Sequence, residues 1–182
     1  FRLVIISVLI FSLVSCGTKN KSERDSRREQ IRNNAEMKRE ELQRVVGVYK
    51  GYVSTTDGSN QNVLLKLDIK DIPGNSDGKV DPVLIPTLSG FLKFTYSTKG
   101  INENGDTIGF EIKKAEYDPK RKTINLTLVN SKYEEVLLDL DKEEDSLKGL
   151  WTAPGLSLTG KINLIDQNSE RGRRNLLPDN KI

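Results

Sequence analysis

The residues that most often carry catalysis are nearly absent from this chain. It has no histidine and a single cysteine, Cys16, among 182 residues. Histidine is the commonest general base and a frequent transition-metal ligand. Its absence excludes a Ser-His-Asp triad, a Cys-His dyad and a zinc-enzyme site with His ligands, and one cysteine excludes an internal disulfide. We therefore predict no catalytic residues, no bound metal, and a protein that is not an enzyme.

Carboxylates are the remaining groups with suitable chemistry. Glu111, Glu116 and Asp118 could supply a pair for hydrolysis of a glycosidic envelope polymer. Asn and Asp residues in segments 57–62 and 75–81 could offer oxygens to a calcium ion. Neither segment matches an EF-hand, and such residues are ordinary turn formers. A carboxylate-dependent hydrolase is therefore kept as an alternative to a non-catalytic function.

The context of the single cysteine is more informative than its chemistry. An apolar run over residues 3–14 ends in Leu13, Val14, Ser15 and Cys16. This stretch resembles the lipobox of bacterial lipoprotein signal peptides. The run has the length of a signal-peptide core and is shorter than the roughly 20 residues that cross a bilayer. The resemblance implies cleavage before Cys16 and a covalent lipid on its thiol, with no other cofactor. An uncleaved anchor or a buried helix is the alternative.

The residues around the cysteine also bear on location. Gly17 follows Cys16, whereas an Asp there marks inner-membrane retention in the familiar sorting pattern of lipoproteins. The resemblance therefore implies a protein anchored in the bacterial cell envelope, at the outer membrane. Two or three acyl chains hold a membrane stably, whereas one does not. The net charge of +3 is too small to predict nucleic-acid binding.

A charged helix is predicted after the cysteine. Residues 17–45 carry nine basic and six acidic side chains and no proline. Ile31, Ala35, Leu42 and Val45 fall on one face at helical spacing. We predict a flexible tether from Cys16 and then a helix over about 26–46, whose C-terminal end packs on the body of the protein. A coiled-coil partner helix and a helix on anionic headgroups are the alternatives.

The body, residues 47–165, changes to the period-two pattern of half-buried strands. Short turns join most of the strands, and we predict an excursion loop over 71–87, which holds Pro73, Pro82 and Pro86. Such a meander favours an antiparallel up-and-down β-barrel, with a β-sandwich as the alternative. The eight predicted strands span 47–54, 63–70, 88–97, 107–117, 123–130, 133–140, 146–152 and 156–165. The predicted regions are a signal peptide (1–15), the lipidated tether and helix (16–46), the barrel (47–165) and a disordered polar tail (166–182).

Two short segments resemble a known barrel family. Gly47-Val48-Tyr49-Lys50-Gly51 opens the first predicted strand, and Gly149-Leu150-Trp151 lies in the seventh. Both are similar to the Gly-x-aromatic opening of lipocalin-like (calycin) barrels, although the lipocalin Gly-x-Trp is here Gly-x-Tyr. The resemblance implies a barrel and no particular ligand.

The aromatic residues give the last functional hint. Period two places five aromatic side chains on inward faces, where they form the core or line an apolar pocket. We predict a non-catalytic binding module for a small apolar or amphipathic ligand, or for a protein partner in the envelope. A structural or interaction lipoprotein without a small ligand is the main alternative. The candidate lining residues are Tyr49, Phe94, Tyr96, Phe110 and Trp151.

Overall fold

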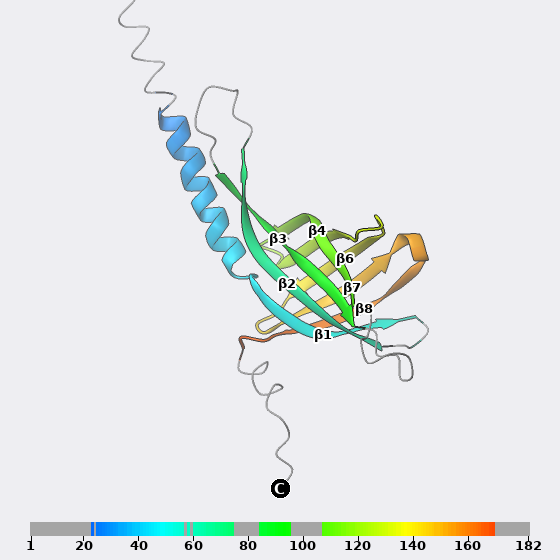
Figure 1. Ribbon diagram of the computed structural model, residues 1–182. Helices are drawn as coiled ribbons and strands as arrows, with labels where there is room; N and C mark the ends of the chain where they lie inside the picture. Colours follow the sequence, from blue (N-terminus) through cyan, green and yellow to red (C-terminus); the bar gives the residue numbers. More distant parts are fainter. Residues whose placement is uncertain are drawn as a thin grey trace, which may run out of the picture. The chain divides into compact units, whose positions relative to one another are not determined.

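The fold is a closed barrel of eight antiparallel strands in sequence order (Figure 1). The computed structural model describes residues 23, 25–56, 58, 60–74, 84–95 and 107–169. The predicted up-and-down barrel is confirmed, and the β-sandwich alternative is wrong. The strands are β1 Gly47–Thr55, β2 Asn60–Pro73, β3 Leu84–Thr95, β4 Thr107–Asp118, β5 Thr123–Val129, β6 Glu135–Lys142, β7 Ser146–Ala153 and β8 Leu158–Asp166.

The barrel closes through its first strand. β1 pairs with β2, where Gly47 lies opposite Leu67, and also with β8, where Tyr49 lies opposite Asp166. Closure satisfies the backbone groups that an open sheet would leave at its outer edges. Because successive residues of a strand point to opposite faces, the register fixes which side chains fill the interior.

The interior is apolar and contributed by all eight strands. Every core side chain is 7% exposed or less. Burial of such side chains is the main favourable term in folding. The core consists of Tyr49, Val53, Val63, Leu65, Leu67, Leu88, Leu92, Phe94, Phe110, Ile124, Leu126, Leu128, Val136, Leu138, Leu140, Leu147, Trp151, Ala153, Ile162 and Leu164, with Leu42 and Val45 from the helical segment.

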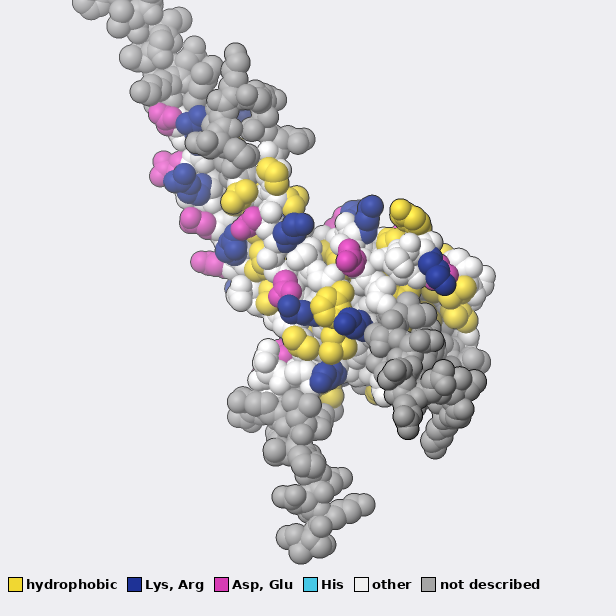
Figure 2. Space-filling model, viewed as in Figure 1, with side chains coloured by type: hydrophobic (Ala, Val, Ile, Leu, Met, Phe, Trp, Pro, Cys, Tyr) yellow, Lys and Arg dark blue, Asp and Glu magenta, His cyan; other side chains and the backbone are white. Residues whose placement is uncertain are grey.

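The helix spans residues 25–43. Its predicted packing is confirmed at the C-terminal end, because Leu42 and the following Val45 are 4% and 0% exposed within the barrel core. Arg39 also donates to the Asp71 carboxylate on β2. Basic and acidic side chains alternate on the visible surface of the helix (Figure 2). The helix thus joins the barrel core through its last turn and the segment after it.

Strands β2 and β3 are longer than predicted, because their ends include prolines that were expected to lie in a loop. The predicted loop 71–87 in fact contributes the end of β2 and the start of β3, including Pro73 and Pro86. In the described residues, the pairing of β3 with β4 begins only at Phe91. A proline is tolerated where a strand has no partner on one side, since no ladder hydrogen bond is lost there.

Two predicted strand starts are also wrong. Residues 154–156 form a short 3-10 helix, η1, because Pro154 starts a turn that ends at Ser157 in the left-handed region, with φ of 52°. Leu156 is therefore 61% exposed instead of inward. Tyr133 is 89% exposed, and β6 begins at Glu135. The loop before it is organised by Asn130, whose Oδ1 accepts from the backbone N–H groups of residues 132 and 134.

A β-bulge interrupts the fourth strand. The register between β4 and β5 shifts between Ile112 and Lys114. The extra residue resets the alternation, so that Ala115 and Tyr117 face the core after Phe110 and Ile112. Bulges of this kind bend a strand and increase its twist.

Candidate functional site

Three of the predicted aromatic residues, Phe94, Phe110 and Trp151, pack together inside the barrel. Phe94 contacts Phe110 edge-on, with ring centroids 5.7 Å apart, and contacts Trp151 at 6.0 Å. Both geometries are typical of packed aromatic cores. Tyr49 is fully buried. Tyr96 lies outside the described residues.

Trp151 is fixed by a polar contact as well as by packing. Its indole N–H donates to the backbone carbonyl of Ser54 on β1, at 3.2 Å. Gly160 makes this approach possible, because a Cβ there would lie 1.7 Å from the Ser54 carbonyl oxygen and 2.6 Å from the indole nitrogen. The indole therefore bridges β7 and β1 across the glycine of β8.

Tyr49 is held in the same way at the other end of the barrel. Its hydroxyl donates to the backbone carbonyl of Val45, at 3.0 Å. Burial raises the pKa of the Tyr49 phenol well above its usual range, and the Asp166 carboxylate and Tyr117 add to the shift. The phenol is thus a neutral hydrogen-bond donor that ties β1 to the segment after the helix.

Several interior side chains are fully buried. A side chain that lined a void of water size would present surface to it. Tyr49, Leu65, Leu92 and Leu128 are 0% exposed, so none of these four lines such a void. Phe94, Phe110 and Trp151 are 4%, 7% and 5% exposed and belong to the same core cluster.

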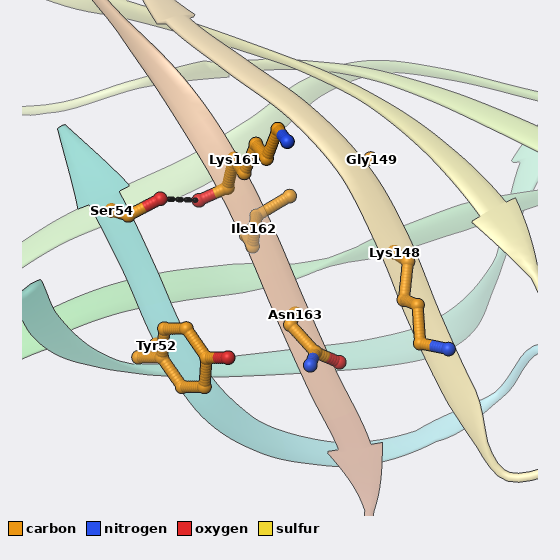
Figure 3. Close-up of a pocket in the computed structure, with 7 residues that line it drawn as sticks. All are labelled: Tyr52, Ser54, Lys148, Gly149, Lys161, Ile162 and Asn163. Atoms are coloured by element: carbon orange, nitrogen blue, oxygen red, sulfur yellow. Dashed lines mark hydrogen bonds between the residues drawn. The ribbon is translucent and has the colours of Figure 1, made fainter. Parts of the chain in front are cut away.

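A groove on the outer wall has the most distinct chemistry of the described surface. It crosses β1, β7 and β8 and has a volume of about 280 Å³ (Figure 3). The register places Asn163 of β8 directly opposite both Tyr52 of β1 and Lys148 of β7. The lining residues are Tyr52, Ser54, Lys148, Gly149, Lys161, Ile162 and Asn163. We call this the β8 groove.

Lysines surround the β8 groove. Lys148 is paired with Glu143, at 2.5 Å between Nζ and Oε2. Within the described part of the chain, Lys161 and the neighbouring Lys50 have no ion pair. Lys50 lies opposite Ile165, two residues from Asn163 on the same face. Among the described residues, the groove is therefore lined by one lysine without an ion pair, Lys161, and by Lys148, which is shared with a carboxylate, while Lys50 lies beside it.

The amide of Asn163 has unused hydrogen-bonding capacity. Its Oδ1 is buried and, among the described residues, accepts no hydrogen bond. Buried polar atoms in folded proteins usually have a partner, and an exception needs an explanation such as a bound molecule. In Figure 3 the Tyr52 hydroxyl points toward the side of the groove that holds Asn163 and Lys148.

Glycines allow the strands that carry the groove to approach their neighbours closely. Cβ atoms at Gly51 and Gly149 would lie 1.9 Å from the carbonyl oxygens of Asn163 on β8 and Asp139 on β6. A Cβ at Gly160 would lie 1.7 Å from the carbonyl oxygen of Ser54 on β1. Close approach therefore depends on glycine at each of these positions.

A second groove, of about 550 Å³, crosses the outer wall at β3, β4 and the end of β5. Lys93 lies over the Phe91 ring there, 5.0 Å from its centroid. The Glu111 carboxylate also lines this groove. It therefore lacks the surplus of cations found in the β8 groove.

Two of the three carboxylates that suggested hydrolysis, Glu116 and Asp118, are engaged locally. Lys114 holds the pKa of Glu116 below its usual range through a 2.8 Å ion pair. Backbone N–H groups of Arg121 and Lys120 lower the pKa of Asp118. A general acid needs the opposite shift. In the described residues, no three Asp, Glu, His or Cys side chains are placed to hold a metal.

The lipobox residues Leu13, Val14, Ser15 and Cys16 lie outside the described residues. Within the part of the chain that the structure covers, no helix has the length and apolar character to span a bilayer. Neither a comparison with protein-family models nor a search of the curated proteins yields a match for this chain.

Proposed function

We propose that this chain is a lipoprotein of the bacterial envelope, anchored by an acylated Cys16, and that its barrel is a non-catalytic binding module. The anchor proposal rests on the sequence Leu13-Val14-Ser15-Cys16 after an apolar run. The lipid would be the only covalent group, and the outer membrane is the proposed location because Gly17, not Asp, follows the cysteine.

The barrel is proposed to be lipocalin-like. Support comes from the closed eight-stranded architecture and from the aromatic residues Tyr49 and Trp151 in the two Gly-x-aromatic segments. Both side chains are buried and hydrogen-bonded to the backbone of another segment. This supports a shared architecture and indicates no shared ligand.

One observation favours binding on the outer wall. The core side chains of the interior are buried, whereas the outer wall exposes three leucines on neighbouring elements. Leu150 of β7 and Leu137 of β6 are diagonal neighbours on the outward face, and η1, which holds Leu156, contacts β6 and β8. They are 54%, 38% and 61% exposed. We call them the leucine patch, and exposed apolar patches commonly mark interaction sites.

The partner proposed for the leucine patch is another protein of the envelope. The matching experiment places a photo-crosslinking residue at position 150 in cells and, as a control, at Lys113 on the far strand β4. A crosslinked species specific to position 150 supports the proposal. Equal yields at both positions would contradict it.

The anchor has its own test. Intact mass spectrometry of protein purified from membranes should give a chain that starts at Cys16 and carries added lipid mass. Cys16→Ala should abolish that mass. A chain without lipid that retains residues 1–15 would overturn the anchor.

A further inference from the structure

Polar and charged side chains line the β8 groove on the outer wall of the barrel. It combines a half-exposed aromatic ring at Tyr52, a buried acceptor at Asn163 Oδ1, and lysines on two adjacent strands, Lys148 of β7 and Lys161 of β8. Directly opposite residues on one face of an antiparallel pair have Cβ atoms about 4.5–5.5 Å apart. Tyr52, Asn163 and Lys148 therefore lie in one row across the groove.

The lysines define the charge of the occupant. Lys161 stands two residues before Asn163 on β8, and Lys50 two residues before Tyr52 on β1, so both flank the row on the same outward face. Lys148 forms an ion pair with Glu143. Asp141 on the neighbouring strand β6 also lies opposite Lys148. Lys161 lies farther from these acids, opposite Leu150 and Ser54. An anionic group is thus favoured at the Lys161 end.

At the centre of the groove, Asn163 favours a hydrogen-bond donor in the ligand in addition to the anion. Asn163 Oδ1 is an acceptor and needs a hydrogen-bond donor, which the ionised oxygens of an anion do not supply. A hydroxyl does. The Tyr52 ring offers a flat apolar surface against which the C–H face of a sugar or polyol can pack. At about 280 Å³, the groove lies at the low end of the roughly 300–1,000 Å³ typical of ligand sites, which suits one such unit.

From these features we infer that the β8 groove binds an anionic polyol, that is, a hydroxyl-bearing carbon frame with a phosphate or carboxylate. The anion lies at Lys161, with Lys50 nearby, and a hydroxyl donates to Asn163 Oδ1 when the partly exposed amide side chain turns toward the groove. A free sugar acid or sugar phosphate and the headgroup of phosphatidylglycerol share this chemistry. The inference rests on the proposed binding function of the barrel and does not require the lipid anchor or the leucine patch.

Calorimetric titration of the full chain in neutral detergent tests the site. The probes are glucose 6-phosphate, glucuronate, uncharged glucose and inorganic phosphate. The charged sugars should bind more tightly than glucose or phosphate, with affinity that falls as salt rises. Lys161→Gln should weaken glucose 6-phosphate binding about tenfold, the size expected for one charged hydrogen bond. Lys113→Gln, which removes an exposed lysine from β4, is the matched control and should change nothing.

Asn163→Ala separates the polyol from the anion. It should weaken binding of glucose 6-phosphate and leave that of inorganic phosphate unchanged, because a hydroxyl of the sugar, and not the phosphate held at Lys161, is proposed to reach the amide oxygen. Unchanged thermal unfolding of each variant shows that the fold is intact. If Asn163→Ala alters neither ligand, or if Lys161→Gln and Lys113→Gln act alike, the inference is overturned.

Vesicles identify the source of the ligand. Binding to phosphatidylglycerol vesicles but not to phosphatidylcholine vesicles, lost in Lys161→Gln, would support the site with a lipid headgroup as its occupant. Binding of the free sugars alone would support it with a soluble ligand. Failure of every probe would overturn the inference, while lipid on Cys16 and crosslinking at position 150 would still report on the proposed function.

Discussion

The inner and outer faces of strands β1, β7 and β8 carry different chemistry on the same backbone. Inward, Leu147, Ile162 and Leu164 are at most 2% exposed. Outward, Lys161 and Asn163 alternate with them along β8 and line a polar groove. Because a strand has a period of two, residues that stabilise the barrel and residues that can bind a ligand are sequence neighbours. Substitutions on the two faces should therefore have separable effects.

The largest effect is expected inside. Trp151→Ala removes a side chain that is 5% exposed, packs on Phe94 and donates to the Ser54 carbonyl. It should lower the free energy of unfolding by about 3–5 kcal/mol, measured by urea denaturation. Tyr133→Ala, at a side chain 89% exposed, is the control and should have little effect. A loss below about 1 kcal/mol for Trp151→Ala would indicate a loosely filled interior and revive the internal ligand pocket.

The next largest effect is expected for Gly160→Ala, which should change both the stability of the interior and the shape of the outer wall. Gly160→Ala forces a Cβ against the Ser54 carbonyl and the Trp151 indole. Overpacking of this kind usually costs about 1–3 kcal/mol, and moving β8 should also disturb the β8 groove. At Gly109 of β4 an added Cβ meets nothing within 4 Å, so Gly109→Ala should be neutral or slightly stabilising. Equal stability of the two variants in urea denaturation would contradict the close approach of β8 and β1.

A third prediction concerns alkaline pH. The raised pKa of Tyr49 means that the folded protein keeps this proton after the unfolded chain has lost it. The contribution of Tyr49 to the free energy of unfolding should be complete below the ordinary phenol pKa of about 10. Above that pH the free energy of unfolding should fall, by at most about 1.4 kcal/mol per pH unit for one group. Tyr49→Phe should flatten that fall.

The comparison for Tyr49 is with a tyrosine on the outer face. Tyr49→Phe should cost about 1 kcal/mol near neutral pH, because it removes the hydrogen bond to the Val45 carbonyl. Tyr52→Phe, at a ring 46% exposed, should leave the stability at neutral pH unchanged. An unchanged alkaline slope in Tyr49→Phe would mean that the buried phenol does not cause the alkaline transition.

Much of the fold was readable from the sequence because it depends on local alternation. Leu147, Gly149 and Trp151, for example, are inward on β7 as the pattern predicts. The errors occur where a local device overrides the pattern. Pro154 starts a 3-10 turn that exposes Leu156, and the bulge after Ile112 shifts the inward positions of β4 by one.

The β8 groove was not predicted, for a physical reason. It depends on the pairing of three strands that are distant in sequence, which sets Tyr52 beside Asn163 and Asn163 beside Lys148. Each of these residues alone is an ordinary outward residue of a strand. Gly51, Gly149 and Gly160 lie on these three strands, but only the register shows that the strands are neighbours.

The smallest effect on stability is expected on the outer wall. It compares an outward and an inward leucine of the same strand directly. Leu150 and Leu147 lie on the same strand, 54% and 0% exposed. Leu150→Ser should change the free energy of unfolding by no more than about 0.5 kcal/mol, as surface substitutions usually do. Leu147→Ser should cost several kcal/mol, because it leaves a cavity and buries a hydroxyl. Since the leucine patch is proposed to contact a partner, Leu150→Ser should instead weaken capture of the partner that crosslinks at position 150. A stability loss comparable with that of Leu147→Ser would mean that Leu150 is buried in the assembled protein, and the outer wall would then belong to a subunit contact of this chain.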